Sequence, residues 1–523
     1  MSEGPASGPT GLDRASLLER LRSGQRWDVV VIGGGASGLG CAVDAAARGH
    51  SVLLVEAHDF GKGTSSRATK LIHGGVRYLA QGRMPLVREA LRERSRLLAN
   101  APHLVRPLRF VVPAYRRRDL VVYALGLSLY DALAGAQALG RWCHLDRRET
   151  LAALPTVRAD GLRGGIAYWD AQFDDARLAI ALMRTVFDLG GVAVNYVAVE
   201  DLIVEAGRVA GVRARDAESG ERFAVAARVV INATGVWADR LRRLEDPQCR
   251  RLLRPSQGVH VVVDRDFLPG TDALLVPRTA DGRVLFVIPW QGKVLIGTTD
   301  TPRDDVAIEP EPLRGEIDFV LETVAAYLAR PPMRADLRSV FAGLRPLLGG
   351  EGRGRTGALS REHLVEVSPG GLVTVTGGKW TTYRRMAEEA VDMAERAGGL
   401  ARRACVTAEL PLHGATAQAG ADLYGSERAL IDTLPGAGRD LHPGLVLSEA
   451  EVRHAARHEL ARTVEDVLAR RNRVLFFDAA LAAAAAPAVA RLLADELGHD
   501  AVWCEAETAR FRAVAGQYAG REA

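Results

Sequence analysis

Residues 28–56 begin Asp-Val-Val-Val-Ile-Gly-Gly-Gly-Ala-Ser-Gly and end Ser-Val-Leu-Leu-Val-Glu, with an alanine-rich stretch between them. This order predicts a strand, a glycine turn, a helix and a second strand. Gly33, Gly35 and Gly38 have the G-x-G-x-x-G spacing, and Glu56 ends the next apolar run about 20 residues later, where such folds place a ribose-binding acid. The glycines allow the tight turn, the approach of backbone to a pyrophosphate and the packing of helix on strand. The stretch therefore predicts a dinucleotide-binding unit.

The composition limits the class of protein. A chain of 523 residues is long enough for about two or three domains. Its net charge of +4 is small for this length and argues against a nucleic-acid-binding surface. The five cysteines show no Cys-x-x-Cys spacing, so we expect no metal site and a reducing compartment. The first 26 residues lack the apolar core of an export signal, and we expect a flexible tail over 1–26.

One apolar stretch, residues 119–140, raises the question of a membrane. It contains Asp131, Gln137 and several glycines, which weaken insertion as a span. It follows Arg116-Arg117-Arg118, and a basic cluster beside an apolar helix can lie on an anionic membrane surface. From the sequence alone we favour a helix packed inside the protein over such a surface helix.

The remaining chain alternates between helical and strand-like patterns. Apolar residues at helical spacing predict helices, and short alternating runs between glycine-bearing turns predict antiparallel strands. The expected helices are 84–100, 174–190, 312–329, the segment that ends near 397, and a mostly helical end over 448–520. The expected strands are 192–199, 202–205, 209–215, 222–226, 228–235, 258–264, 273–276, 284–288, 293–297 and 363–376.

The glycine turn cannot by itself separate NAD from FAD, but two later segments can. Thr234-Gly235 ends a buried strand, and Gly377-Gly378 opens into a helix. A flavin needs several such backbone approaches, and a helix N-terminus beside its ring stabilises negative charge on the reduced form. We therefore predict FAD.

The predicted fold class is α/β: a Rossmann-like FAD-binding domain interleaved with an antiparallel β-rich substrate domain, plus a C-terminal helical domain. The expected segments are a flexible tail over 1–26; the FAD-binding domain over 27–100, 155–250 and 345–400; the substrate-binding domain over 101–154 and 251–344; and the C-terminal helical cap over 405–523.

Several blocks, in order, resemble those of the FAD-dependent glycerol-3-phosphate dehydrogenases of the bacterial aerobic, respiratory type. The resemblance covers about 27–400, and it is looser in the alanine-rich C-terminal part. The blocks are Val31–Gly38, Thr64–Leu79, Asp174–Leu178, Ile231–Trp237, Phe286–Trp290, Gly297–Asp300, Ala342–Pro346 and Gly377–Arg384.

This resemblance implies oxidation of sn-glycerol 3-phosphate to dihydroxyacetone phosphate. It implies that FAD accepts the hydride and that electrons pass to a membrane quinone, ubiquinone or menaquinone. It also implies a peripheral position on the cytoplasmic, inner face of the cell membrane. A homodimer is one assembly open to such a chain.

Cationic and imidazole side chains in these blocks, and His260 in the further block Gly258–Val262, are the candidates for substrate chemistry. A phosphate dianion calls for fixed cations, and guanidinium groups bind its oxygens in pairs. By resemblance Arg77 and Arg345 hold the substrate, and Lys379 reaches both flavin and substrate. Removal of the hydroxyl proton calls for a base, usually histidine. We rank His260 first as that base, with Arg345 and Lys379 beside it in the catalytic group, and we expect His73 to shape the substrate site or to touch the cofactor.

The cofactor candidates fall into two groups. Gly33, Gly35, Gly38 and Glu56 follow from the mechanics of the turn described above. The others depend on the resemblance, with the hydroxyl groups of 64–66 suited to the pyrophosphate and the flavin ring. They are Thr64, Ser65, Ser66, Lys70, Gly235, Gly378, Lys379 and Thr381.

Four alternatives stay open at this point. A glycerol-3-phosphate oxidase that produces hydrogen peroxide shares every block. An amino-acid oxidase of the same superfamily also needs arginine for its substrate carboxylate, although Gly377–Arg384 argues against it. The anaerobic multi-subunit enzyme carries a C-terminal cysteine cluster, whereas only Cys504 occurs after Cys405 here. A flavoprotein without activity is disfavoured by the intact candidates.

Overall fold

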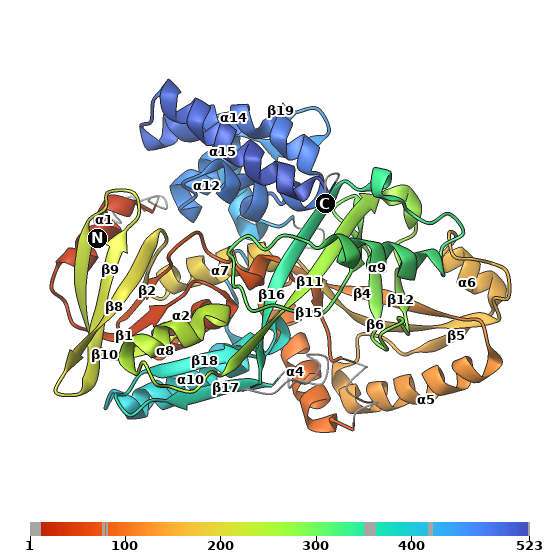
Figure 1. The fold of residues 1–523 in the computed structure, drawn as a ribbon, viewed down its shortest axis with the longest axis horizontal. Helices are drawn as coiled ribbons and strands as arrows, with labels where there is room; N and C mark the ends of the chain where they lie inside the picture. Colours follow the sequence, from red (N-terminus) through yellow and green to blue (C-terminus); the bar gives the residue numbers. More distant parts are fainter. Residues whose placement is uncertain (1–11, 76–78, 80–81, 350–361, 417–421, 521–523) are drawn as a thin grey trace, which may run out of the picture.

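The structure is a computed structural model that describes residues 12–75, 79, 82–349, 362–416 and 422–520 (Figure 1). Two large sheets lie side by side, and a helical domain formed by the C-terminal residues lies across their junction (Figure 1). This arrangement confirms the predicted fold class.

The first sheet contains eight strands within the described ranges, and its centre is parallel in the order β18-β10-β1-β2-β7. Val29 and Val31 of β1 belong to a core shared with α2 (Ala36–Ala47), α7 (Asp175–Asp188) and α10 (Tyr383–Ala397). Val30 and Ile32 face the opposite core, because successive side chains of a strand alternate between faces. The strands are β1 (Trp27–Ile32), β2 (Val52–Val55), β7 (Val192–Val194), β8 (Val197–Glu205), β9 (Arg208–Asp216), β10 (Arg222–Asn232), β17 (His363–Val367) and β18 (Val373–Gly377).

The second sheet contains ten strands in the described chain and is antiparallel except where β12 pairs with β4. Helices α6 (Arg147–Ala153) and α9 (Arg314–Ala325) pack toward one core, and α4 (Met84–Asn100) and α5 (Arg117–Ala134) toward another. The strands are β3 (Leu71–Ile72), β4 (Val105–Ala114), β5 (Cys143–Leu145), β6 (Gly164–Phe173), β11 (Leu253–Asp264), β12 (Ala273–Val276), β13 (Leu285–Trp290), β14 (Lys293–Gly297), β15 (Thr301–Pro302) and β16 (Ser339–Leu348).

The C-terminal part has a core of its own, built from alanine, leucine and valine side chains that also touch Val262, Leu295 and Phe341 of the second sheet. Its elements are α11 (Arg428–Ile431), β19 (Asp440–His442), β20 (Leu445–Ser448), α12 (Glu449–Glu459), the π-helical turn η10 (Asp466–Arg471), α13 (Val474–Phe477), α14 (Ala479–Leu497) and α15 (Ala501–Tyr518).

The expectation of a flexible tail is wrong for residues 13–22; residues 1–11 lie outside the described ranges. Helix α1 (Arg14–Arg22) begins at Asp13, whose carboxylate accepts from the N–H groups of Ala15 and Ser16. Arg14 is buried and its guanidinium lies 2.5 Å from Asp216. A buried ion pair to Asp216 of β9, 202 residues later in the chain, therefore orders the helix. Local sequence does not show such a distant partner.

The sheets also shift three expected domain boundaries. Strand β6 lies in the second sheet, paired along its length with β4, although we assigned 155–250 to the FAD-binding domain. Strand β3 also joins the second sheet, although it lies within 27–100 of the expected FAD-binding domain. Strand β16 joins it too, and crosses the expected boundary at residue 345. Long antiparallel pairing partners, rather than nearby motifs, decide to which sheet these strands belong.

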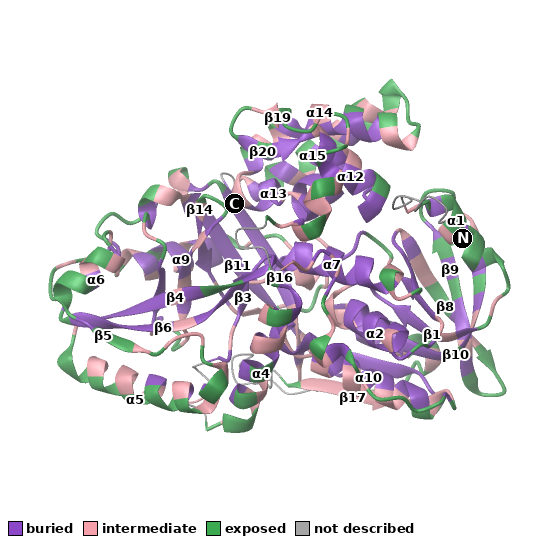
Figure 2. Ribbon diagram, turned by 180° about the vertical axis from the view of Figure 1, so that it is seen from behind, coloured by how far each residue is buried: buried purple, intermediate pink, exposed green. Residues whose placement is uncertain are grey.

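Helix α5 contradicts the preference for a helix packed inside the protein. Only Leu127, Tyr130 and Ala134 of this helix are buried. Val121, Val122 and Leu125 are 70%, 64% and 74% exposed, and Figure 2 shows the helix along the outer edge of the molecule. Within the described ranges, Arg117–Gln137 is the helical stretch long and apolar enough to cross a membrane, with a mean hydropathy of 1.3.

Candidate active site

The glycine loop connects β1 to α2 with no room for side chains. Gly33 has φ of 108°, a region that favours glycine, and a Cβ there would lie 2.7 Å from the carbonyl oxygen of Ala233. A Cβ on Gly38 would lie 1.9 Å from the carbonyl oxygen of Gly33. Gly35 is the N-cap of α2. Gly33 and Gly38 thus serve the turn and the close contact of helix and loop, as their spacing predicts, and the approach of backbone to a pyrophosphate stays a prediction.

Three other candidates meet at this loop. Glu56 accepts the N–H of Gly34 at 2.6 Å, and burial raises the pKa of this carboxyl group. Ser65 Oγ accepts the N–H of Ala36 at 2.9 Å, at the first turn of α2. Gly235 follows β10, which pairs with β1 in parallel. A helix N-terminus with a glycine approach and a nearby acid suits the pyrophosphate and ribose of a dinucleotide.

A cavity of about 1130 Å³ lies between the second sheet and the loop after β18. It continues to helix α5, whose Val122, Leu125 and Leu129 line it. Because apolar walls with a few convergent polar groups are typical of ligand sites, this cavity is the candidate active site. The predicted residues that line it are Thr64, His73, His260, Arg345, Gly378, Lys379 and Thr381.

His260 of β11 reaches this cavity from the second sheet. Its Nε2 lies 2.9 Å from Thr69 Oγ1, and its ring stacks on Phe341 with centroids 4.9 Å apart. Its Nδ1 is buried without a hydrogen-bond partner in the described chain. Burial, followed by the charges of Lys70 and Arg345, holds the pKa of His260 well below 6.5. The imidazole is therefore neutral at physiological pH and able to accept a proton.

Arg345 of β16 lies beside it. Its guanidinium donates to Thr298 Oγ1 at 3.1 Å and to the carbonyl oxygen of Gln257 at 3.4 Å. The Asp300 carboxylate lies 3.9 Å away, and the side chain is 21% exposed. These contacts hold the planar group at the cavity wall, and a guanidinium in that position can bind phosphate oxygens in pairs.

Lys379 approaches from the first sheet, after β18, whereas His73 follows β3 of the second sheet. The N–H of His73 donates to Thr381 Oγ1 at 3.3 Å, which ties the segment after β3 to the short helix η7 (Trp380–Thr382). Lys379 and Gly378 precede that helix, and Gly378 has φ of 68°. The cavity thus brings two imidazoles and Arg345 of the second sheet together with Lys379 of the first.

Lys70, a predicted cofactor residue, lies behind the 64–66 turn. Its side chain is fully buried and does not line the cavity as described. Its Nζ donates to Asp175 at 2.7 Å and to the carbonyl oxygen of Ser66 at 2.9 Å, among the rings of Trp290, Phe341 and Phe476. Burial lowers the pKa of Lys70 to about 7. The side chain of Lys70 supports the 64–66 turn through Ser66, and a contact of Lys70 with the cofactor stays a prediction.

Ser66 is similarly enclosed. Its side chain is 1% exposed, and its Oγ has no hydrogen-bond partner in the part of the chain that is described. Arg77 lies outside the described residues.

Two site residues escaped the sequence analysis. Thr69 contacts His260, and Thr298 contacts Arg345. Both occur in blocks that carry the family resemblance, so their positions were visible although their partners were not. Cavity residues from α5 had no such signal, because an apolar helix looks the same whether or not it borders a site.

Comparisons with known proteins agree with this geometry. Residues 28–384 match a family of FAD-dependent oxidoreductases, and residues 372–503 match the C-terminal domain of alpha-glycerophosphate oxidase. A probable mitochondrial glycerol-3-phosphate dehydrogenase of Caenorhabditis elegans is 39% identical over 96% of this chain and 74% of its own length. The chain belongs to the FAD-dependent glycerol-3-phosphate dehydrogenase family.

Two further members of the family extend this result. The mitochondrial enzyme SDP6 of Arabidopsis thaliana is 38% identical over 94% of this chain and 86% of its own length. The solved structure of glycerol-3-phosphate dehydrogenase from Bacillus halodurans, complexed with FAD, has a TM-score of 0.78 and 30% identity and covers 98% of both chains. The cofactor of this glycerol-3-phosphate dehydrogenase family member is FAD, as predicted, and the glycine loop and α2 N-terminus fit its pyrophosphate.

Proposed function

We propose that the protein oxidises sn-glycerol 3-phosphate to dihydroxyacetone phosphate and passes the two electrons to a membrane quinone. The main support is that one cavity connects Arg345, Lys379 and two histidines to the exposed apolar helix α5. A phosphorylated alcohol needs the charged end of that cavity. A quinone needs a route from lipid, which the apolar end supplies.

The cations bind the substrate, and the histidine removes its proton. Arg345 and Lys379 bind the phosphate and the neighbouring oxygens, and Arg345 also lowers the pKa of the hydroxyl that must ionise. His260, neutral in this setting, takes the hydroxyl proton. When bound, FAD accepts the hydride released from the same carbon. The apolar walls of the cavity lower the dielectric constant around the charged groups, which strengthens their interactions with the substrate.

We propose further that the protein lies on the inner, cytoplasmic face of the cell membrane through α5. The buried residues of α5 face the protein at helical spacing, Val121 is exposed outside the cavity lining, and Val122 and Leu125 line the cavity while they stay largely exposed. The helix begins at Arg116-Arg117-Arg118, all exposed, which suits an anionic lipid surface. An interfacial helix with one packed face explains its exposure without a membrane span.

A V121E variant is expected to bind anionic vesicles less tightly. The lost apolar burial costs about 1.5 kcal/mol and the added charge about 1 kcal/mol, which together lower the partition into the membrane roughly 60-fold. Sedimentation with phosphatidylglycerol vesicles measures the bound fraction. Because Val121 does not line the cavity, V121E should reduce a soluble dye at the wild-type rate. Val446, 87% exposed on the C-terminal domain, is the matched control as V446E. Equal sedimentation of V121E and wild type would exclude α5 as the membrane contact.

The reaction itself is tested on the purified holoprotein. Anaerobic glycerol 3-phosphate should bleach the flavin absorbance, and a short-chain quinone should restore it faster than air-saturated buffer. Flavin that stays oxidised with this substrate would contradict the proposed reaction. Faster recovery in air, with hydrogen peroxide formed, would identify an oxidase instead.

A further inference from the structure

The C-terminal helical domain makes four polar contacts with the segment that follows β2, residues 56–70, and its Phe476 ring also lies 5.4 Å from Lys70 Nζ. Lys62 Nζ lies 2.8 Å from Glu465, and Arg67 donates to Tyr518 Oη at 3.2 Å. Arg473 donates to the carbonyl oxygen of Ser66 at 2.7 Å. The fourth contact is Asp59, which receives two arginines. The segment that holds Glu56 and Ser65 at the glycine loop is therefore covered by another domain.

Asp59 is the centre of this contact and is fully buried. Both Arg470 and Arg471, adjacent in the π-helical turn η10, donate to its Oδ2, and Arg471 Nη2 also reaches Oδ1 at 3.0 Å. Asn195 Nδ2 lies 3.3 Å from the same Oδ1. Burial would raise the pKa of Asp59, but the two guanidinium groups outweigh it and hold the pKa below its usual value.

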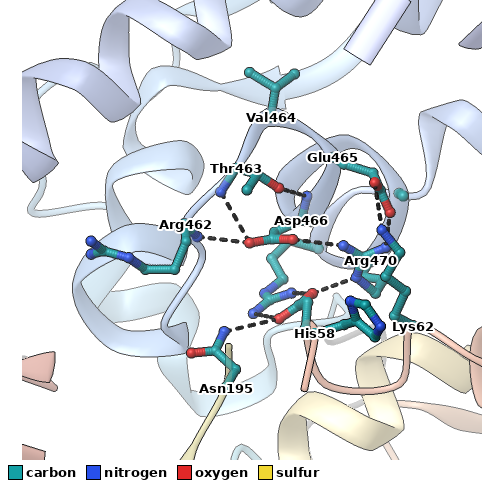
Figure 3. Close-up of polar contacts among 12 residues, drawn as sticks. His58, Lys62, Asn195, Arg462, Thr463, Val464, Glu465, Asp466 and Arg470 are labelled. Carbon is teal, nitrogen blue, oxygen red and sulfur yellow. Dashed lines mark hydrogen bonds and ion pairs between the residues drawn. The ribbon is translucent and has the colours of Figure 1, made fainter. Parts of the chain in front are cut away.

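The surrounding charges balance and fix η10 itself. Glu465 and Asp466 lie 2.7 and 2.6 Å from Arg470, and Asp466 also accepts the N–H groups of Arg462 and Thr463 (Figure 3). Lys62 joins Glu465 from the other domain (Figure 3). π-Helical turns are rare and occur frequently at functional sites. Here the turn presents two neighbouring arginines to one carboxylate.

Three hydrogen bonds made by the neighbours of Asp59 connect its segment to the glycine loop. The His58 N–H donates to Glu56 Oε1 at 2.8 Å, while Glu56 Oε2 accepts the N–H of Gly34. The Gly61 N–H donates to the carbonyl oxygen of Gly34 at 2.9 Å. Residues on both sides of Asp59 thus touch Gly34. Fixing Asp59 fixes the loop at the place where the fold binds the ribose and pyrophosphate.

We propose that Arg470 and Arg471 are positioning residues for FAD: through Asp59 they hold the 56–63 loop in the conformation that binds the adenosine end of the cofactor. The C-terminal domain is then part of what retains FAD, although these arginines need not touch it. This role is independent of the substrate and of the electron acceptor, so it stands apart from the proposed reaction.

D59N is the decisive variant, because it keeps the shape of the side chain and removes its charge. We expect FAD to bind the apoprotein of D59N about tenfold or more weakly, measured by flavin fluorescence. Heating should release flavin at a lower temperature than wild type, before the loss of circular dichroism. R470K, which keeps the charge but cannot contact Asp59, Glu465 and Asp466 together, should show a smaller loss in the same direction.

Glu496 supplies a matched control. Its carboxylate also receives two arginines, Arg453 and Arg457, each at 2.6 Å, within the same domain and away from the loop. E496Q should retain wild-type FAD affinity. Wild-type FAD affinity in D59N, or an equal loss in E496Q, would overturn the proposal.

A measurement on wild-type protein covers the case in which D59N does not fold. Hydrogen exchange is compared between apoprotein and holoprotein. FAD should slow amide exchange in residues 56–63 and also in 464–473, since the two segments are coupled through Asp59. Protection confined to the glycine loop and 56–63 would overturn the proposal.

Discussion

An H260A variant is expected to lose roughly 10²- to 10⁴-fold in kcat, with KM for glycerol 3-phosphate changed much less. The reason is the position of the imidazole in the cavity, between Thr69 and the ring of Phe341 and close enough to Arg345 for that charge to affect its pKa. Removal of this base leaves water to take the proton, while the phosphate contacts remain. Steady-state kinetics with a soluble acceptor measure both constants.

The other cavity histidine provides the comparison. H73A should alter KM and kcat together if His73 shapes the site, as we expect. A large loss of kcat in H73A with near-normal turnover in H260A would transfer the role of base to His73.

The pH dependence checks the same assignment in the wild-type enzyme. A base must be unprotonated, and the folded-state pKa of His260 lies well below 6.5. The active form is therefore already complete at pH 6.5, and kcat/KM should not fall on acidification until well below that value. An acid limb centred at 6.5 would indicate an unburied histidine as the base.

An R345A variant is expected to raise KM sharply. A hydrogen bond to a charged group contributes about 1.5–3 kcal/mol, which corresponds to roughly a 10- to 150-fold loss of affinity. The guanidinium is held by Thr298 and Gln257, so its removal deletes a preorganised donor instead of a mobile one. R345K should lie between the two, because an ammonium keeps the charge but not the paired geometry.

Arg303 is a suitable control for R345A. It pairs with Asp305 at 2.7 Å in a neighbouring loop and does not line the cavity as described. R303A should keep the wild-type KM. Unchanged KM and turnover in R345A would remove Arg345 from the substrate site.

Much of the site could be predicted because its parts are local. Gly33 and Gly38 are required by contacts within one turn and one helix, so their spacing is sufficient evidence. His260, Arg345 and Lys379 were found through short blocks, and the structure brings all three to one cavity. Their separate roles stay predictions, since a cavity shows proximity and not the order of proton and hydride removal.

Lys70 shows where local evidence fails. It lies four residues from Ser66, but its side chain turns to Asp175 and to aromatic rings of three other segments. Its left-handed backbone, φ 61°, contributes to this direction. No pattern within a single block encodes such a set of partners.

By itself the sequence determined the nucleotide-binding unit, the alternation of its strands, the family and the cofactor, because each depends on the order and spacing of neighbouring residues. Only the tertiary structure decided that α5 is exposed, that β6 belongs to the second sheet and that two arginines of the C-terminal domain meet Asp59. These features depend on which distant segments share a surface, and the free energy of those contacts is gained only once the whole chain has folded.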